Sequence, residues 1–511
     1  MKYLIGIDVG TSSMKTLLIN EVGQVIGSAT EFYPFETPKP LWSEQDPAHW
    51  WKATCVSIKR VLEENNVNAP DVVGLGLTGQ MHGLVLLDND NKVLRPCILW
   101  NDQRTGKQCE DITNRVGKAH VLELTGNPVL AGFTAPKIAW VQDNEPEVFA
   151  KATKALLPKD YVRFLLSGEF FSDVSDASGT SLLNVGKRDW SSQMLDALGL
   201  KRDFLPEVTE STVASTRISA AAAAATGLLE GTPIAAGGGD QAAQAVGSGI
   251  VREGIVSATL GTSGVVFAHS DQYRVEPSGK LHAFCHAVPG KWHLMGVMLS
   301  AAGSFEWYKN ALGAAEAAEA KASGRNVFDL LTEQAAEAPA GSEGLLFLPY
   351  LSGERTPHPD PLAKGTFFGM SLRHSKPHIT RSVLEGITFG MNDSLQLMRD
   401  LGLEINEVRA SGGGAKSDFW LQMQADIYQS KVVTTNVTEG AAFGAAVLAG
   451  VASGVYSDID TAAAQIVKNT GETNPGPNEA VYSDYYPEYQ ALYPALKDRF
   501  KSISKVVEKH L

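Results

Sequence analysis

A short motif of glycine and hydroxyl residues occurs twice in the chain, each time between two apolar runs. The first copy is Asp8-Val-Gly-Thr-Ser and the second is Leu260-Gly-Thr-Ser, about half of the 511 residues further on. A repeat at half the chain length indicates two related lobes, each of which offers a strand–turn–strand hairpin to a shared cleft. In each hairpin we expect the glycine to let a ligand approach closely, and the backbone N–H groups and hydroxyls to surround an anion such as phosphate.

Asp8 ends the first apolar run, which begins at Tyr3. A carboxylate at the end of a buried strand is suited to hold Mg²⁺ or its waters, because this ion takes oxygen ligands and usually keeps water. An ordinary hairpin with a polar turn explains the first copy equally well when it is taken alone. The second copy favours the phosphate-binding interpretation.

Length and composition limit the class of protein. A chain of 511 residues exceeds one hydrophobic core, so two large domains are expected. The net charge of −13 argues against nucleic-acid binding. Four scattered cysteines without a CxxC pair indicate reduced thiols and no zinc site. Neither a signal peptide nor a membrane-spanning run is recognised, so we expect a cytoplasmic protein without a membrane partner.

Two further glycine-rich segments stand before helical patterns. Asp240 follows three glycines and opens a helix of small residues. An N-cap role explains the acid but needs no triple glycine, so we favour a base that takes a proton from a substrate hydroxyl. Gly412–Gly414 precede another helix, and a nucleotide suits that position because a helix N-terminus favours negative charge.

The segment between residues 74 and 83 combines two signals. Gly74–Gly79 matches GxGxxG, but a strand rather than a helix follows, so a dinucleotide site is not expected. The polar loop 78–83 stands at a strand end, where open α/β sheets bind ligands. His82 in this loop either donates a hydrogen bond to a substrate hydroxyl or is satisfied by the backbone, and both interpretations stay open. Residues 115–235 look mostly helical, and Ser172–Thr180 is a polar loop that we place facing the cleft.

The ordered set of motifs resembles the FGGY carbohydrate kinases of the actin–hexokinase–Hsp70 ATPase superfamily. The carrying segments are Gly6–Ser12, Gly237–Asp240, Leu260–Ser263, Ser411–Gly414 and a signature from Gly365 through Glu385. This resemblance implies an α/β, two-lobed actin-like (ribonuclease H-like) fold with duplicated mixed-sheet domains and an interdomain cleft. It further implies an N-terminal sugar-binding lobe, residues 1–249, and a C-terminal nucleotide-binding lobe with a C-terminal helix, residues 250–511.

The same resemblance implies transfer of phosphate from ATP, with Mg²⁺, to a sugar hydroxyl. Gln80–Gly83 and Leu99–Arg104 are similar to the loops of family members that act on D-xylulose in xylose catabolism, which implies its 5-hydroxyl as the acceptor. Asp240 is implied as the base and Asp8 as the metal-binding residue. The other implied contacts are Met81, His82, Asn101, Asp240 and Gln241 to the sugar, Gly10, Thr11, Ser12, Gly261 and Thr262 to the phosphates, and Gly413 and Gly414 beside the adenosine.

Two alternatives remain within the superfamily. One is an FGGY kinase for another sugar or polyol, such as ribulose, gluconate or glycerol. The other is a non-kinase Hsp70-like ATPase, against which stands the lack of a separate peptide-binding domain after the second lobe. A homodimer is expected only from the habit of the family.

Overall fold

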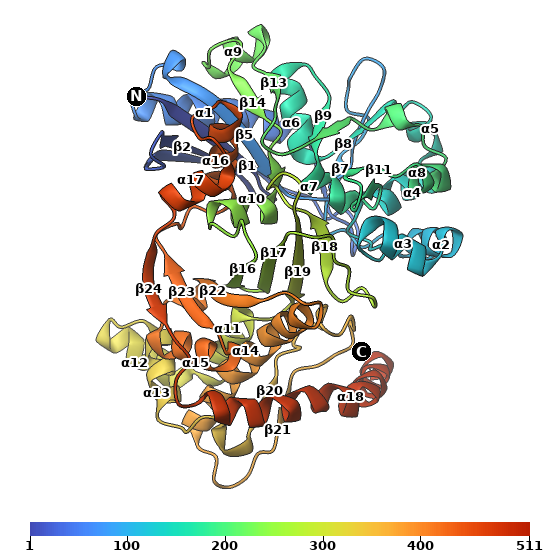
Figure 1. Ribbon diagram of the computed structural model, residues 1–511. Helices are drawn as coiled ribbons and strands as arrows, with labels where there is room; N and C mark the ends of the chain where they lie inside the picture. Colours follow the sequence, from blue (N-terminus) through green and yellow to red (C-terminus); the bar gives the residue numbers. More distant parts are fainter. Residues whose placement is uncertain (511) are drawn as a thin grey trace.

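The structure is a computed structural model that describes residues 1–510. Its upper half in Figure 1 contains a seven-stranded mixed sheet with the order β13-β14-β5-β1-β2-β3, in which β15 also pairs with β5. In this sheet β1 is antiparallel to β2 and parallel to β5. The strands are β1 (Tyr3–Val9), β2 (Ser13–Asn20), β3 (Val25–Phe32), β5 (Val72–Gly79), β13 (Ala214–Arg217), β14 (Pro233–Ala235) and β15 (Gly238–Gly239).

A second seven-stranded sheet lies in the lower half of Figure 1, with the order β18-β19-β17-β16-β22-β23-β24. Here β16 is antiparallel to β17 and parallel to β22, which repeats the arrangement around β1. The predicted two-lobed α/β fold is therefore confirmed, while the lobe boundary between residues 249 and 250 stays a prediction. The strands are β16 (Gly254–Leu260), β17 (Gly264–Ser270), β18 (His282–Cys285), β19 (Trp292–Met298), β22 (Ile405–Gly412), β23 (Lys431–Thr435) and β24 (Asn469–Thr473).

Helices and five small two-stranded sheets complete the molecule. The helices are α1 (Ala48–Glu64), α2 (Gly106–Val116), α3 (Lys118–Thr125), α4 (Thr134–Asn144), α5 (Pro146–Phe149), α6 (Pro158–Ser167), α7 (Val174–Ala177), α8 (Ser192–Leu198), α9 (Ala220–Thr226), α10 (Asp240–Gly247), α11 (Ala302–Leu312), α12 (Ala314–Ser323), α13 (Val327–Ala336), α14 (Lys376–Asp400), α15 (Asp418–Tyr428), α16 (Ala441–Ala452), α17 (Ile459–Ile466) and α18 (Glu479–His510). The small sheets pair β4 (Glu44–Gln45) with β7 (Cys97–Ile98), β6 (Val85–Leu87) with β8 (Lys154–Leu156), β9 (Phe171–Asp173) with β12 (Glu207–Thr209), β10 (Leu183–Asn184) with β11 (Asp189–Trp190), and β20 (Leu346–Leu348) with β21 (Thr366–Phe368).

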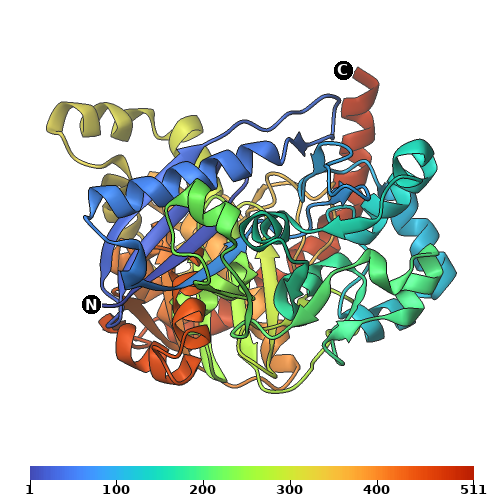
Figure 2. The same ribbon diagram turned by 90° about the horizontal axis from the view of Figure 1, so that it is seen from above.

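The region 115–235 is less helical than the sequence patterns indicate. Short strands, β8 to β14, alternate with its helices. These strands have two to four residues each, which is too short to produce a clear alternation of apolar and polar positions. The helix α18 runs along the outside of the second lobe, and in Figure 2 its C-terminal end projects beyond its neighbours. Within residues 1–510, no helix is long and apolar enough to cross a membrane.

Helix α16 comes from the C-terminal half of the chain but packs against β1 and β5 of the first sheet and against α10 (Figure 1). Glycines allow this close approach. A Cβ atom at Gly6 or Gly76 would lie 1.9 or 2.0 Å from a backbone oxygen of α16, and one at Gly444 would lie 1.7 Å from the Ala243 oxygen of α10. The Gly74–Gly79 pattern therefore makes room for a helix instead of binding a dinucleotide. The opposite face of the sheet carries Ile5 and Ile7, which pack in the core formed with α1.

Candidate active site

Three adjacent parallel strands end at the same edge of the first sheet, and each ends at a predicted site residue or loop. Asp8 on β1 is paired with Thr78 on β5, and Gly79 is paired with Gly239 on β15. The loop 80–83 follows β5, and Asp240 follows β15 as the first residue of α10. This register brings Asp8, the polar loop and Asp240 together, although the three are far apart in the sequence.

Both carboxyl groups at this edge have raised pKa values. Burial, and secondarily the charge of Asp8, raise the pKa of Asp240 to about 7. Burial raises the pKa of Asp8 to about 6, and the charge of Lys15 opposes this shift. The Asp240 Oδ1 atom accepts a hydrogen bond of 2.7 Å from the Gln241 backbone N–H. A carboxyl group with a pKa near neutrality, poised between its two protonation states, is suited to act as a general base.

The donor set fits Mg²⁺ that arrives with a phosphate-bearing ligand. Asp8 is an oxygen donor at the end of β1, and among residues 1–510 no group of three or more His, Cys, Asp or Glu side chains is arranged to hold a metal ion. Magnesium is usually bound by one or two carboxylates together with waters and substrate phosphates, not by an all-protein cage. The raised pKa values also indicate that a nearby cation would stabilise the charged carboxylates.

The first hairpin turn is hydrogen-bonded to the two loops that contain Gln80 and Trp100. The Gly10 N–H donates to the Ser13 oxygen (3.0 Å). The Thr11 hydroxyl donates to Gln80 Oε1 (3.2 Å) and accepts from Trp100 Nε1 (2.9 Å), so it is occupied within this lobe. Ser12, in contrast, is exposed at the tip of the turn. The hydroxyl available to a phosphate is therefore that of Ser12, while Thr11 joins the turn to the loops that follow β5 and β7.

One ring nitrogen of His82 is hydrogen-bonded to the backbone, and the other is free of protein partners among residues 1–510. Its Nδ1 atom lies 2.6 Å from the Gly179 carbonyl oxygen, which can only accept, so Nδ1 carries the proton. Burial lowers the pKa of His82 to about 3, which keeps the ring neutral. The Nε2 atom, which has no partner within residues 1–510, is then an acceptor. Of the two interpretations left open by the sequence, the structure favours a His82 ring satisfied by the backbone, and the free Nε2 atom could only accept a hydrogen bond.

The ring and backbone of His82 are held by residues that sequence reasoning missed. Phe133 stacks on the imidazole with the ring centroids 4.4 Å apart. Lys137 Nζ donates to the His82 carbonyl oxygen (2.7 Å) and, because it is buried, has its pKa lowered to about 7. The ring of Phe284 on β18 lies 6.5 Å from the same ring between centroids, so the second lobe borders the loop 80–83 directly. No spacing in the sequence connects these residues.

The remaining predicted sugar contacts lie around this loop. Met81 is buried, and its sulfur lies 3.0 Å from the position that a Cβ atom of Gly239 would take. Asn101 is exposed, whereas the next residue, Asp102, is buried. The Asp102 carboxylate accepts hydrogen bonds from Arg104 and from the Ser43 N–H, and these bonds fix the shape of the loop. The sequence pattern indicated the whole loop 99–104, but it did not predict that Asn101 is exposed while Asp102 is buried.

The second hairpin turn repeats the first and lines a cavity. The Gly261 N–H donates to the Ser263 oxygen (3.0 Å). Gly261, Thr262 and Gly413 line a cavity of about 290 Å³ that continues to aromatic and polar side chains of α13 and α15. Gly414, by contrast, is buried against Leu260 and does not line this cavity. Of the predicted nucleotide-binding residues, Gly261, Thr262 and Gly413 therefore converge here, whereas Gly414 and the first hairpin turn do not line this cavity.

A larger cavity of about 640 Å³ joins the two lobes. It is lined by Gln241 and Gln244 of α10 on one side and by Thr259, Arg409 and Gly413 on the other. Gly413 lines both cavities. A ligand seated against the second hairpin can therefore extend one end toward α10, at whose first position Asp240 stands.

This arrangement defines a phosphotransferase cleft, and comparison with known proteins names the class. The N-terminal domain of the FGGY family of carbohydrate kinases matches residues 3–247, and the C-terminal domain of that family matches residues 256–453. The chain belongs to the FGGY family of carbohydrate kinases.

Individual proteins are similar to this chain over most of its length. The chain is 40% identical over 499 residues to the xylulose kinase of Bacillus subtilis (strain 168), covering 98% of each chain. It is 46% identical over 423 residues to the xylulose kinase of Escherichia coli (strain K12), covering 83% of this chain and 84% of that one. The crystal structure of xylulose kinase from Rhodospirillum rubrum is 30% identical with a TM-score of 0.91, covering 98% of this chain and 100% of that one. A gluconokinase of B. subtilis is 30% identical over 508 residues, covering 99% and 96%.

Proposed function

We propose that this FGGY kinase transfers the terminal phosphoryl group of ATP to the 5-hydroxyl of D-xylulose. The observation that carries the proposal is the position of Asp240, which lies at the same edge of the first sheet as Asp8 and directly precedes Gln241, a residue that lines the cavity reaching Gly413. The xylulose kinases among its relatives, at 40–46% identity, support D-xylulose as the acceptor.

Each group has a defined task in this proposal. Asp240 takes the proton of the attacking hydroxyl, and the His82 Nε2 atom accepts a hydrogen bond from a second hydroxyl of the sugar. The turns at Ser12 and Thr262 offer N–H and hydroxyl donors to the phosphates. Asp8 would hold Mg²⁺ or its waters, and this ion neutralises phosphate charge when it is bound. Positioning and charge neutralisation account for most catalysis of phosphoryl transfer, so few residues need to react chemically.

A substrate panel tests the proposal. ADP release with Mg-ATP is measured across D-xylulose, L-ribulose, glycerol, gluconate and L-fuculose. A strong preference for D-xylulose supports it. Preference for another acceptor, such as gluconate, retains the kinase and the role of Asp240 but rejects the assignment of the sugar loops. Hydrolysis of ATP without any acceptor would favour the Hsp70-like alternative.

The cytoplasmic location and the homodimer stay predictions.

The pKa of Asp240 predicts the pH dependence of the reaction. Because the base has to be deprotonated in the free enzyme and its pKa is about 7, kcat/KM for D-xylulose should rise as pH increases toward 7 and level off above it. Below the pKa the expected slope is about tenfold per pH unit. The rising part of this profile below the pKa is called the acid limb, and it is measured from initial rates at subsaturating D-xylulose between about pH 5.5 and 9. A profile that is flat from the lowest pH would contradict the assignment of Asp240 as the base.

A further inference from the structure

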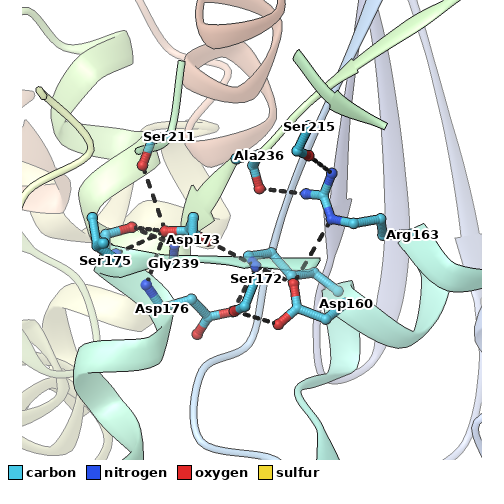
Figure 3. A network of polar contacts seen from close by, with 12 residues as sticks. Asp160, Arg163, Ser172, Asp173, Ser175, Asp176, Ser211, Ser215, Ala236 and Gly239 are labelled. Atoms are coloured by element: carbon cyan, nitrogen blue, oxygen red, sulfur yellow. Dashed lines mark hydrogen bonds and ion pairs between the residues drawn. The ribbon is translucent and has the colours of Figure 1, made fainter. Parts of the chain in front are cut away.

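A network of charged side chains lies completely buried beneath the turn that carries Asp240 (Figure 3). At its centre is Lys159 on α6, whose Nζ atom forms an ion pair with Asp160 and lies 2.7 Å from Asp173 and 3.3 Å from Asp176. Asp173 ends β9, and Asp176 lies on α7. The acids of the polar loop that we placed facing the cleft therefore point into the interior.

The charges of this network balance. Arg163, one turn after Lys159 on α6, is a second buried cation and approaches Asp160. Burial raises the pKa of Asp176 well above its usual range, and the charge of Asp173 adds to this effect. Burial therefore favours the protonated, neutral form of Asp176, in which two other carboxyl groups remain for the two cations. Buried charges are costly unless they are paired in this way, and a well-packed apolar core would give equal or greater stability. Stability alone does not account for the network.

Two side chains of the network, Ser175 and Arg163, are hydrogen-bonded to the backbone of the glycine turn or of the residues just before it, and we call them the two arms of the network. The Ser175 hydroxyl donates to Asp173 Oδ1 (2.5 Å) and accepts from the Gly239 N–H (3.1 Å). The Arg163 guanidinium donates to the backbone oxygens of Ala235 (2.9 Å) and Ala236. Figure 3 shows both arms, with Gly239 near Ser175 and Ala236 near Arg163. The residues between these two anchors are Gly237, whose φ is +79°, and Gly238.

A turn made of three glycines has no side chains to pack, and glycine is conformationally permissive, so its geometry is set by the pairing of β15 with β5 and by the contacts of Ser175 and Arg163. The position of Asp240 then depends on groups outside the turn. We propose that Ser175, oriented by the Lys159–Asp173 ion pair, is a positioning residue that sets the place of Asp240 through the Gly239 N–H. This inference rests on the proposed function, because it takes Asp240 as the base.

The test compares two serines of the same network. Ser175→Ala removes the link to Gly239. Ser172→Ala removes a hydroxyl that is buried to the same degree and donates to Asp160 (2.6 Å) but makes no contact with the turn. Ser175→Ala loses two buried hydrogen bonds and Ser172→Ala loses one, so both variants should melt below the wild type, with the larger fall for Ser175→Ala. They should differ in the kinetics of phosphoryl transfer.

For Ser175→Ala we expect kcat with D-xylulose to fall by about tenfold or more, because a small displacement of a reacting group costs up to about 100-fold. The acid limb of the pH profile should move to lower pH, since a looser turn admits water and reduces the burial that raises the pKa of Asp240. The KM for ATP should stay the same, because the ATP contacts of the second lobe are unchanged. Ser172→Ala should retain the wild-type kcat and pH profile.

Several outcomes overturn the inference. One is a Ser175→Ala variant with wild-type kcat and pH limb; another is an equal kinetic loss in both variants. If Ser175→Ala does not fold, Ser175→Cys replaces it, because the thiol has a similar size but makes weaker hydrogen bonds. A wild-type kcat and pH limb in that variant would equally overturn the role. Failure of the proposed function is distinguished by the unmodified enzyme, which would then show no D-xylulose turnover in the same assay.

Discussion

Asp240→Asn is expected to lower kcat for D-xylulose phosphorylation by about 10² to 10⁴-fold, the range that general-base catalysis contributes. The amide has nearly the same shape as the carboxyl group, but it cannot take a proton from the sugar hydroxyl. The variant is measured by ADP release at saturating Mg-ATP and D-xylulose, and Asp240→Ala should give a similar loss. Turnover near the wild-type level in either variant would contradict the assignment of Asp240.

The melting temperature of Asp240→Asn serves as the control for its loss of activity. The pKa of Asp240 is higher in the folded protein than its ordinary value, so the proton is held more tightly in the native state. Ionisation of Asp240 therefore destabilises the fold, and this cost is present above about pH 7 and absent at low pH. Asp240→Asn should melt at the same or a higher temperature than the wild type at pH 8. A lower melting temperature would indicate that the loss of activity reflects damage to the fold.

Gly444→Ala is expected to destabilise the protein strongly. The added Cβ atom would lie 1.7 Å from the Ala243 oxygen, and because that atom belongs to the backbone of α10 it cannot move aside as a side chain would. Overpacking of this kind costs about 3 kcal/mol or more. Since α10 begins with Asp240, displacement of this helix should also reduce kcat. Thermal melting and initial rates at a temperature where the variant is folded measure the two effects.

Gly106→Ala is the matched control for this substitution. Gly106 begins α2, and a Cβ atom there meets nothing within 4 Å. Alanine at that position should be neutral or stabilise the protein by about 0.5 to 1 kcal/mol, because it reduces the freedom of the unfolded chain. If both glycine variants melt like the wild type, the close packing of α10 against α16 is wrong.

The parts of the site that depend on local chain chemistry could be predicted from the sequence. Asp8, Gly261 and Asp240 each stand where an apolar strand meets a glycine turn, and such a change of pattern is visible within a dozen residues. The half-length repeat indicated that two of these turns belong to equivalent hairpins, and the structure confirms the same pairing around β1 and β16.

The support of the site could not be predicted, because it depends on contacts between distant residues. Lys137, on α4, and Phe133, which directly precedes that helix, contact His82 from about 50 positions further along the chain, and no periodicity marks them. Lys159 and Asp173 look like surface residues in the sequence, since charged side chains are rarely buried. Their burial follows from the tertiary structure alone. The protonation of the His82 ring was likewise fixed only when the structure placed the Gly179 carbonyl beside it.

The position of α16 has a consequence for how the chain folds during synthesis. All seven strands of the first sheet are complete by residue 239, yet the helix that covers one of its faces ends at Ala452. While the ribosome makes the intervening residues, the surface around Gly6 and Gly76 stays uncovered, and its closure waits for a contact of very large sequence separation. A polypeptide that ends at residue 249 contains the whole sheet without its cover, and such exposed apolar surface favours aggregation over independent folding.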